Sequence, residues 1–161
     1  MNYTDEFSEG EWELLGRLPL VVATMISAVD YSTMSEQREY KAFATFLGKA
    51  GDKRRKSDFV AAILDDVVEA DQETFVSHCT AVSSAMSGEK PIETALRQVK
   101  AAGLMLDQRL DKRDAKAYKE FIVDVAIAVA RAHKESALPF ASSVSKVEDF
   151  HIRRIQTALG I

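Results

Sequence analysis

The stretch that decides the fold is residues 145–160, which read SKVEDFHIRRIQTALG. Ser145 and Glu148 have the Ser-x-x-Glu spacing of a capping box, in which a hydroxyl and a carboxylate each bond a free amide at a helix start. Ile152 and Ile155 follow at helical spacing, and Gly160 supplies a stop. This stretch therefore predicts an amphipathic helix that ends at residues 159–160.

The same signals recur along the chain. Ser8 with Glu11 and Thr33 with Glu36 form two more capping boxes, and Pro91 suits the first turn of a helix. Glycine (7) and proline (3) are too scarce for the frequent turns of a β-sandwich or barrel. We therefore expect an all-α fold of about seven helices. Their ranges are 9–30 (with proline at position 19 as a kink or a new start), 33–48, 59–68 capped by residue 57, 72–86, 91–110, 111–133 and 145–159.

Length and composition predict one domain covering residues 1–161. The lone cysteine, Cys79, cannot form an internal disulfide, and residues 1–6 are acidic where a signal peptide would be basic. The apolar run 121–130 is about half the length that spans a bilayer. A net charge of −4 argues against general nucleic-acid binding. The expectations are a cytoplasmic location, no membrane insertion and no nucleic-acid partner.

The helix expected at 33–48 repeats the one at 145–160. Both begin with a capping box, and both end at a Leu-Gly pair that starts eleven residues after the capping glutamate. An alanine-rich apolar helix precedes each, ending at Asp30 in the first case and at His133 in the second. Two related hairpins predict a pseudo-twofold arrangement. The alternative is that any two capped amphipathic helices look alike.

This pattern resembles the TerB-like (tellurite-resistance) family, with hairpin repeats at approximately 19–48 and 121–161. The resemblance implies a non-enzymatic all-helical domain associated with stress and tellurite resistance, in which acidic loop residues bind metal. The matching positions are Asp30, Glu36 and Glu148. The chain departs from the family pattern at Tyr31, where the family has glycine, and at His133, where it has aspartate.

Two groups of side chains are candidate metal ligands. Asp30, Glu36 and Glu39 surround the start of the helix at 33–48, and several oxygen ligands suit Ca²⁺ or Mg²⁺. The alternative is that Glu36 closes its capping box and that Glu39 lies in solvent and stabilises the helix dipole.

The second group is His133, Glu148 and His151. Two histidines and a carboxylate suit a transition metal, and Glu148 and His151 are separated by one helical turn. The alternative is a capping glutamate beside a solvent-facing histidine.

No glycine-rich phosphate loop, nucleophile elbow or dense histidine–cysteine cluster is present, so we expect a binding module rather than an enzyme. The leading hypothesis is a metal-responsive module that engages a protein partner or a second copy of itself. The second hypothesis is a purely structural interaction or dimerisation module without metal. An enzyme acting through His133, Glu148 and His151 ranks third.

Overall fold

The structure, a computed structural model, describes residues 3–29, 57–69, 90–135 and 144–161, together with residues 82, 84 and 88. For residues 68, 69 and 132–135 the description covers the backbone only. The expected helix at 33–48 and most of the one at 72–86 lie outside these residues. The described elements are the 3₁₀-helix η1 (Tyr3–Glu6) and the α-helices α1 (Glu9–Val29), α3 (Asp58–Glu69), α5 (Pro91–Arg109), α6 (Lys112–Glu135) and α7 (Lys146–Leu159).

The described part of the chain is all-helical, which confirms the predicted class. It contains five α-helices, so the expected total of seven is not confirmed. The second helix of the first predicted hairpin falls outside the described residues. The internal repeat therefore stays a prediction.

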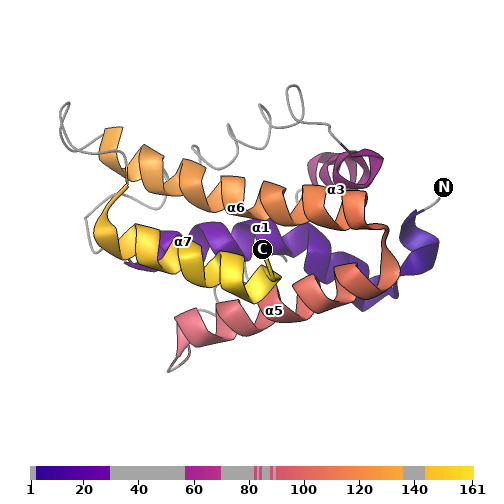
Figure 1. Cartoon of the computed structure of the whole chain (residues 1–161), viewed down its shortest axis with the longest axis horizontal. Coiled ribbons are helices and arrows are strands. Elements are labelled where there is room, and N and C mark those ends of the chain that lie inside the picture. Colours follow the sequence, from indigo (N-terminus) through magenta and orange to yellow (C-terminus); the bar gives the residue numbers. More distant parts are fainter. Residues whose placement is uncertain are drawn as a thin grey trace.

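Helix α1 is the centre of the arrangement. It contacts α3, α5, α6 and α7, and Figure 1 shows it between α6 and α5, behind α7. Among the described helices, α1 is the one long and apolar enough to cross a bilayer by length and composition. The core helix of a globular domain passes the same test, and α1 contacts four other described helices.

Two predicted capping boxes are confirmed by their hydrogen bonds. The Ser8 amide donates to Glu11 Oε2 at 2.8 Å, and the Glu11 amide donates to Ser8 Oγ at 3.4 Å. The same pair of bonds joins Ser145 and Glu148 at 2.7 and 3.2 Å. Helix α7 ends where the sequence predicted, because Gly160 takes a left-handed conformation with φ of 75°.

The cap of α3 also connects it to α6. Ser57 Oγ accepts hydrogen bonds from the amides of Phe59 and Val60, as the sequence predicted for an N-cap. The same hydroxyl donates to Asp114 Oδ1 at 2.6 Å. Asp111 caps α6 by accepting from the Asp114 amide at 2.9 Å. A side chain in the first turn of α6 therefore anchors the start of α3.

Pro19 lies inside α1, which continues from Glu9 to Val29, so the alternative that Pro19 begins a separate helix is wrong. Proline has no N–H, and the Leu15 carbonyl four residues earlier therefore loses its usual helical donor. The Tyr118 hydroxyl of α6 donates to that oxygen at 2.5 Å. Both Leu15 and Tyr118 are fully buried. Helix α6 thus completes the hydrogen bonding of α1 where proline interrupts it.

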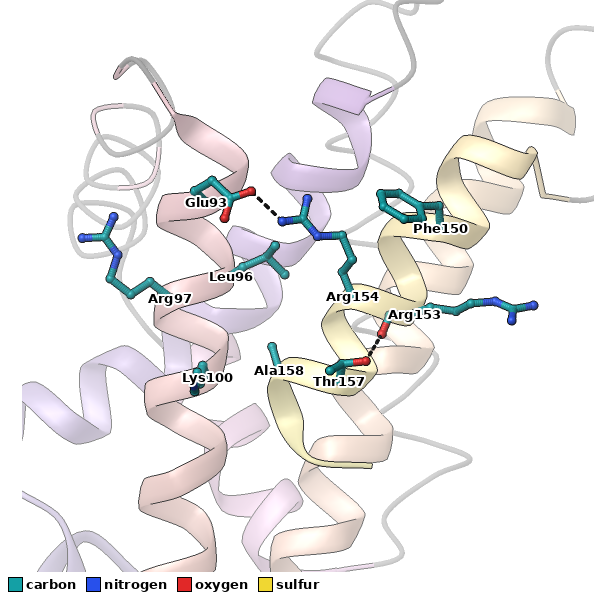
Figure 2. Close-up of a pocket in the computed structure, with 9 residues that line it drawn as sticks. All are labelled: Glu93, Leu96, Arg97, Lys100, Phe150, Arg153, Arg154, Thr157 and Ala158. Carbon is teal, nitrogen blue, oxygen red and sulfur yellow. Dashed lines mark hydrogen bonds and ion pairs between the residues drawn. The ribbon is translucent and has the colours of Figure 1, made fainter.

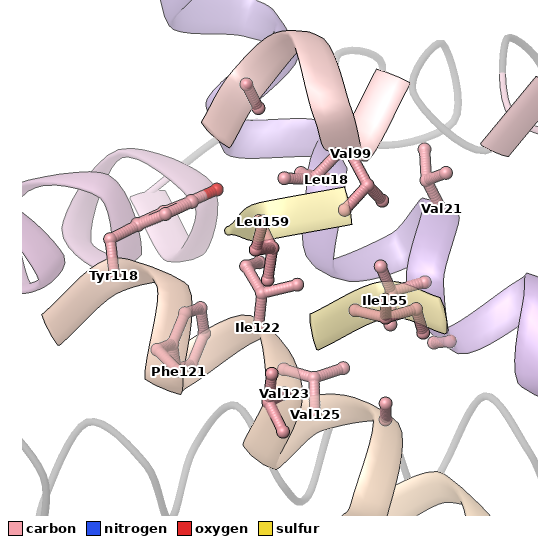
Figure 3. Close-up of a cluster of buried hydrophobic side chains, with 14 of the residues drawn as sticks. Leu18, Val21, Val99, Tyr118, Phe121, Ile122, Val123, Val125, Ile155 and Leu159 are labelled. Carbon is pink, nitrogen blue, oxygen red and sulfur yellow. The ribbon is translucent and has the colours of Figure 1, made fainter. Parts of the chain in front are cut away.

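The core lies where α1, α5, α6 and α7 meet. Figure 3 shows Leu18 of α1, Val99 of α5, Ile122 of α6 and Ile155 of α7 gathered in it, and all four are fully buried. Ile155 belongs to the apolar stripe that the sequence predicted for this helix. Burying a side chain of this size contributes about 1.5–3 kcal/mol, so these contacts supply much of the stability.

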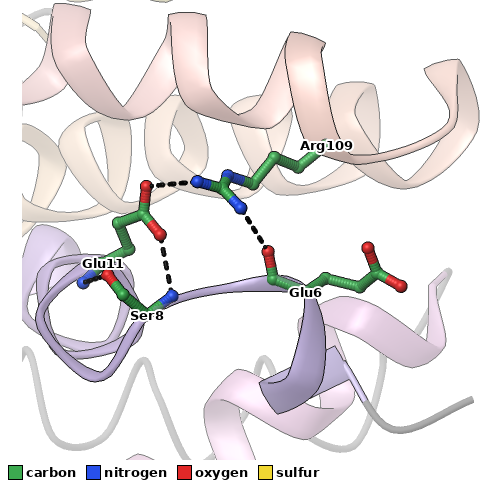
Figure 4. Close-up of polar contacts among 4 residues, drawn as sticks. All are labelled: Glu6, Ser8, Glu11 and Arg109. Atoms are coloured by element: carbon green, nitrogen blue, oxygen red, sulfur yellow. Dashed lines mark hydrogen bonds and ion pairs between the residues drawn. The ribbon is translucent and has the colours of Figure 1, made fainter.

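The N-terminal segment is tied to the end of α5 by one arginine (Figure 4). Arg109 donates to the Glu6 carbonyl at 2.8 Å and to Glu11 Oε1 at 2.9 Å. Its guanidinium carbon also lies 6.0 Å from the ring centre of Phe7, which is buried. This contact fixes η1 against the bundle, at the end away from the groove described next.

Candidate functional site

An open groove runs between α5 and α7, with a volume of about 670 Å³ (Figure 2). Its lining combines apolar and cationic side chains with one acidic residue and one threonine. Helix α5 contributes Glu93, Leu96, Arg97 and Lys100, and α7 contributes Phe150, Arg153, Arg154, Thr157 and Ala158. These positions follow helical spacing along one face of each helix. At 1.5 Å per residue the lined faces are about 10–12 Å long.

Gly103 determines where the two helices touch. A Cβ at this position would lie 3.1 Å from Leu159 Cα, 3.2 Å from Leu159 O and 3.3 Å from Ala158 O. These distances are tighter than most real Cβ contacts, so a side chain here would push the α7 backbone away by a few tenths of an ångström. Figure 2 shows α7 running away from α5 toward its N-terminal end. The groove therefore occupies the side of the contact on which the helices diverge.

Arg154 spans the groove. Its Nη2 atom bonds Glu93 Oε1 at 2.5 Å, and its guanidinium carbon lies 5.8 Å from the ring centre of Phe150. The hydrogen bond from Arg154 and then its positive charge lower the pKa of Glu93. Phe150 is 58 % exposed, so its ring is accessible to a ligand as well as to Arg154. The groove thus already holds one carboxylate against an arginine.

The other cations flank the groove rather than fill it. Arg153 bonds Asp149 Oδ2 at 2.9 Å, and Figure 2 shows its side chain extending outward from α7. Arg97 extends outward from α5 in the same view. Arg97 and Lys100 are exposed, and neither has an ion-pair partner among the described residues. A ligand lying between the helices would therefore meet an apolar middle, with Leu96 and Ala158, between positive edges.

Glu148 and His151 are buried residues of α7, the helix that forms one side of this groove. Glu148 is fully buried, and its Oε1 atom has no hydrogen-bond partner among the described residues. His151 is 9 % exposed, and its Nδ1 atom is likewise without a described partner. Burial lowers the pKa of His151, Arg154 adds to this effect, and Glu93 opposes it. The alternative of a solvent-facing histidine at position 151 is wrong, whereas the capping role of Glu148 is confirmed.

The remaining predicted ligands are not placed. Asp30, Glu36 and Glu39 lie outside the described residues. His133 falls within α6, but its side chain is outside the description. In the described ranges no three histidine, cysteine or acidic side chains come together as a metal site. The structure therefore shows two candidate ligand atoms without described partners, Glu148 Oε1 and His151 Nδ1, on residues one helical turn apart. The position of a third ligand is not described.

The groove was not predicted from the sequence. One signal for it is Phe150, an aromatic residue of α7 that does not continue the buried line of Ile152 and Ile155. A second is the spacing of Arg97 and Lys100, which places two cations on one face of α5. Neither signal shows that the two faces meet.

Comparison with known proteins identifies no relative of this chain. No protein-family model matches the chain, and no curated protein and no solved structure is significantly similar to it. The resemblance to TerB-like proteins therefore stays a prediction from the sequence.

Proposed function

We propose that this chain is a non-catalytic helical interaction module whose binding surface is the α5–α7 groove. The observation that carries the proposal is the combination of an open groove with an exposed aromatic residue, Phe150, and an arginine, Arg154, at its mouth. Aromatic and arginine side chains dominate the binding energy of many protein interfaces. The occupant is a segment of a partner protein or of a second copy of the chain.

Filling the groove tests this proposal. Peptides that bind the full chain are selected from a displayed library of random 12-residue sequences, and their sites are mapped by amide chemical shifts. Ala158→Trp should weaken binding by at least about tenfold, because the indole would occupy the space that the ligand needs. Lys112→Trp places the same side chain at an exposed position on α6 and is the control. Selected ligands whose shifts map away from α5 and α7, or that bind the Ala158→Trp variant normally, would contradict the proposal.

A divalent metal is the second candidate, and the unpartnered Glu148 Oε1 and His151 Nδ1 atoms favour it. Buried polar atoms without partners are costly, and a cation between them would remove that cost. This would give the second hairpin the metal-responsive role that the TerB-like resemblance implies, with His133 as a further ligand. Asp30, Glu36 and Glu39 are the corresponding candidates for Ca²⁺ in the first hairpin.

Thermal denaturation with Zn²⁺, Mn²⁺ or Ca²⁺ tests the metal. A ligand present at 100 times its Kd stabilises the folded chain by about 2.7 kcal/mol. Glu148→Gln is a suitable variant, since glutamine preserves the capping box but binds metal poorly. His151→Gln should also abolish a Zn²⁺ shift, and Asp30→Ala with Glu36→Ala should abolish a Ca²⁺ shift. If no metal changes the melting temperature of the unmodified chain, this candidate is removed.

A further inference from the structure

The groove between α5 and α7 selects its occupant by charge as well as by shape. Four of the nine lining side chains are cationic and one is acidic, although the whole chain has a net charge of −4. The lining side chains therefore have a net positive charge, although Asp149 beside Arg153 offsets part of it. Such a local field attracts acidic segments and repels basic ones.

We infer that the occupant is an acidic amphipathic segment of a partner protein, with one apolar side chain between Leu96 and Ala158 and carboxylates toward Arg97, Lys100 and Arg154. This inference rests on the proposed function. The lined faces are about 10–12 Å long, which matches two turns of helix or about four extended residues. Recognition of an amphipathic helix by a groove uses one apolar line and flanking charges, as this arrangement offers.

The existing contact of Glu93 with Arg154 shows how such a carboxylate binds. The charged pair joins the first turn of α5 to the middle of α7, and the Phe150 ring lies 5.8 Å from the same guanidinium. A carboxylate of the partner would share Arg154 with Glu93 or replace it. The next cations along α5, Arg97 and Lys100, have no described ion pair to break.

A protein segment fits this surface better than a nucleic acid or a lipid bilayer. Single-stranded nucleic acids stack on several aromatic rings, whereas the lining of this groove has one, Phe150. A flat bilayer could reach the exposed Phe150 but not the floor between the helices at Leu96.

The test uses two fluorescent 12-residue peptides with identical leucines at helical spacing. One has glutamate at the remaining positions and the other has glutamine. We expect the glutamate peptide to bind the full chain at least about tenfold more tightly at low salt. This preference should shrink as the salt concentration rises, because salt screens exposed charges.

Two charge-reversal variants identify the surface. Arg97→Glu with Lys100→Glu should weaken the glutamate peptide by at least about tenfold and change the glutamine peptide much less. Lys112→Glu with Arg131→Glu alters the net charge equally on two exposed residues of α6 and should leave both affinities unchanged. Phe150→Ala should weaken both peptides, because it removes apolar contact rather than charge. Melting curves check that every variant is folded.

The outcomes distinguish the preference for an acidic segment from the proposed interaction function. Equal binding of both peptides at the groove would overturn the acidic preference and leave the interaction module standing. Binding of neither peptide, while library-selected neutral peptides map to the groove, would have the same meaning. Failure of both the selection and the peptides would overturn the proposed function as well. Groove-dependent binding of anionic vesicles or an oligonucleotide without peptide binding would overturn the protein partner.

Discussion

Replacing Tyr118 by phenylalanine should destabilise the fold by removing the donor that satisfies the Leu15 carbonyl. The hydroxyl lies 2.5 Å from that oxygen, and both residues are fully buried, so water does not replace the lost bond. A buried carbonyl left without a donor costs about 1–3 kcal/mol. For a chain of this size each kcal/mol lowers the melting temperature by about 2–4 °C. Urea denaturation followed by circular dichroism at 222 nm measures the change.

The cost of losing the Tyr118 hydroxyl should also depend on Pro19. Pro19→Ala restores an N–H that can bond the Leu15 carbonyl, so Tyr118→Phe should cost less in that background. The difference between the two costs is a coupling energy, and we expect about 1–2 kcal/mol. Tyr3→Phe is the matched control: it removes a hydroxyl that donates to Asp114 Oδ2 at 2.9 Å and not to a carbonyl of α1. If Tyr118→Phe costs the same with proline or alanine at position 19, the hydroxyl does not compensate for the proline.

Three further predictions concern stability. Gly103→Ala should destabilise the fold by about 1–3 kcal/mol, because its Cβ meets backbone atoms of α7. Gly10→Ala, where a Cβ has nothing within 4 Å, should stabilise the fold by about 0.5–1 kcal/mol. Equal effects of the two variants in thermal unfolding would contradict the close helix approach. His151 has a pKa lowered by burial below its usual 6.5, so the unfolded chain binds more protons and the free energy of unfolding should fall as the pH drops below about 6.5. His151→Gln should flatten this part of the urea-measured pH profile, and an unchanged slope would assign it to other groups. Lys119 is 3 % exposed and bonds both carboxylate oxygens of Asp107 at 2.7 Å. Asp107→Ala should therefore destabilise the fold by more than the loss of an exposed ion pair, which typically contributes about 0–1 kcal/mol. A smaller loss in urea denaturation would show that the ammonium finds another partner.

The helix boundaries were predictable from sequence because their causes are local. Ser8, Ser57 and Ser145 bond amides within three residues, and Gly160 ends α7 through its own backbone conformation. Such bonds depend on spacing along the chain and not on the rest of the fold. The same locality explains why Pro91 correctly indicated the start of α5.

Properties that depend on which helices meet were not predictable. The alternative considered for His151 was a solvent-facing side chain. Helix α7 contacts α1, α5 and α6, so the buried face of this helix is wider than the line through Ile152 and Ile155 and includes His151. Tyr118 could not be linked to Pro19 by any spacing, since 99 residues separate them and only packing brings α6 against α1. Glu148 and His151 both lie in α7, as the sequence predicted, whereas the burial of His151 was not predicted.

The groove follows from one of these non-local contacts. Gly103 lets the last turn of α7 approach α5 at backbone distance, and the helices diverge from that point toward Glu93 and Arg154. If the contact at Gly103 were looser, the two helices would not be held at a fixed point, and we expect their separation near Glu93 to vary. The close approach at Gly103 thus positions α7 against α5 at one end of the groove. Gly103→Ala should therefore change peptide affinity at the groove, even though Gly103 contacts no charged group of the lining. Normal affinity in a folded Gly103→Ala variant would show that other contacts set the groove width.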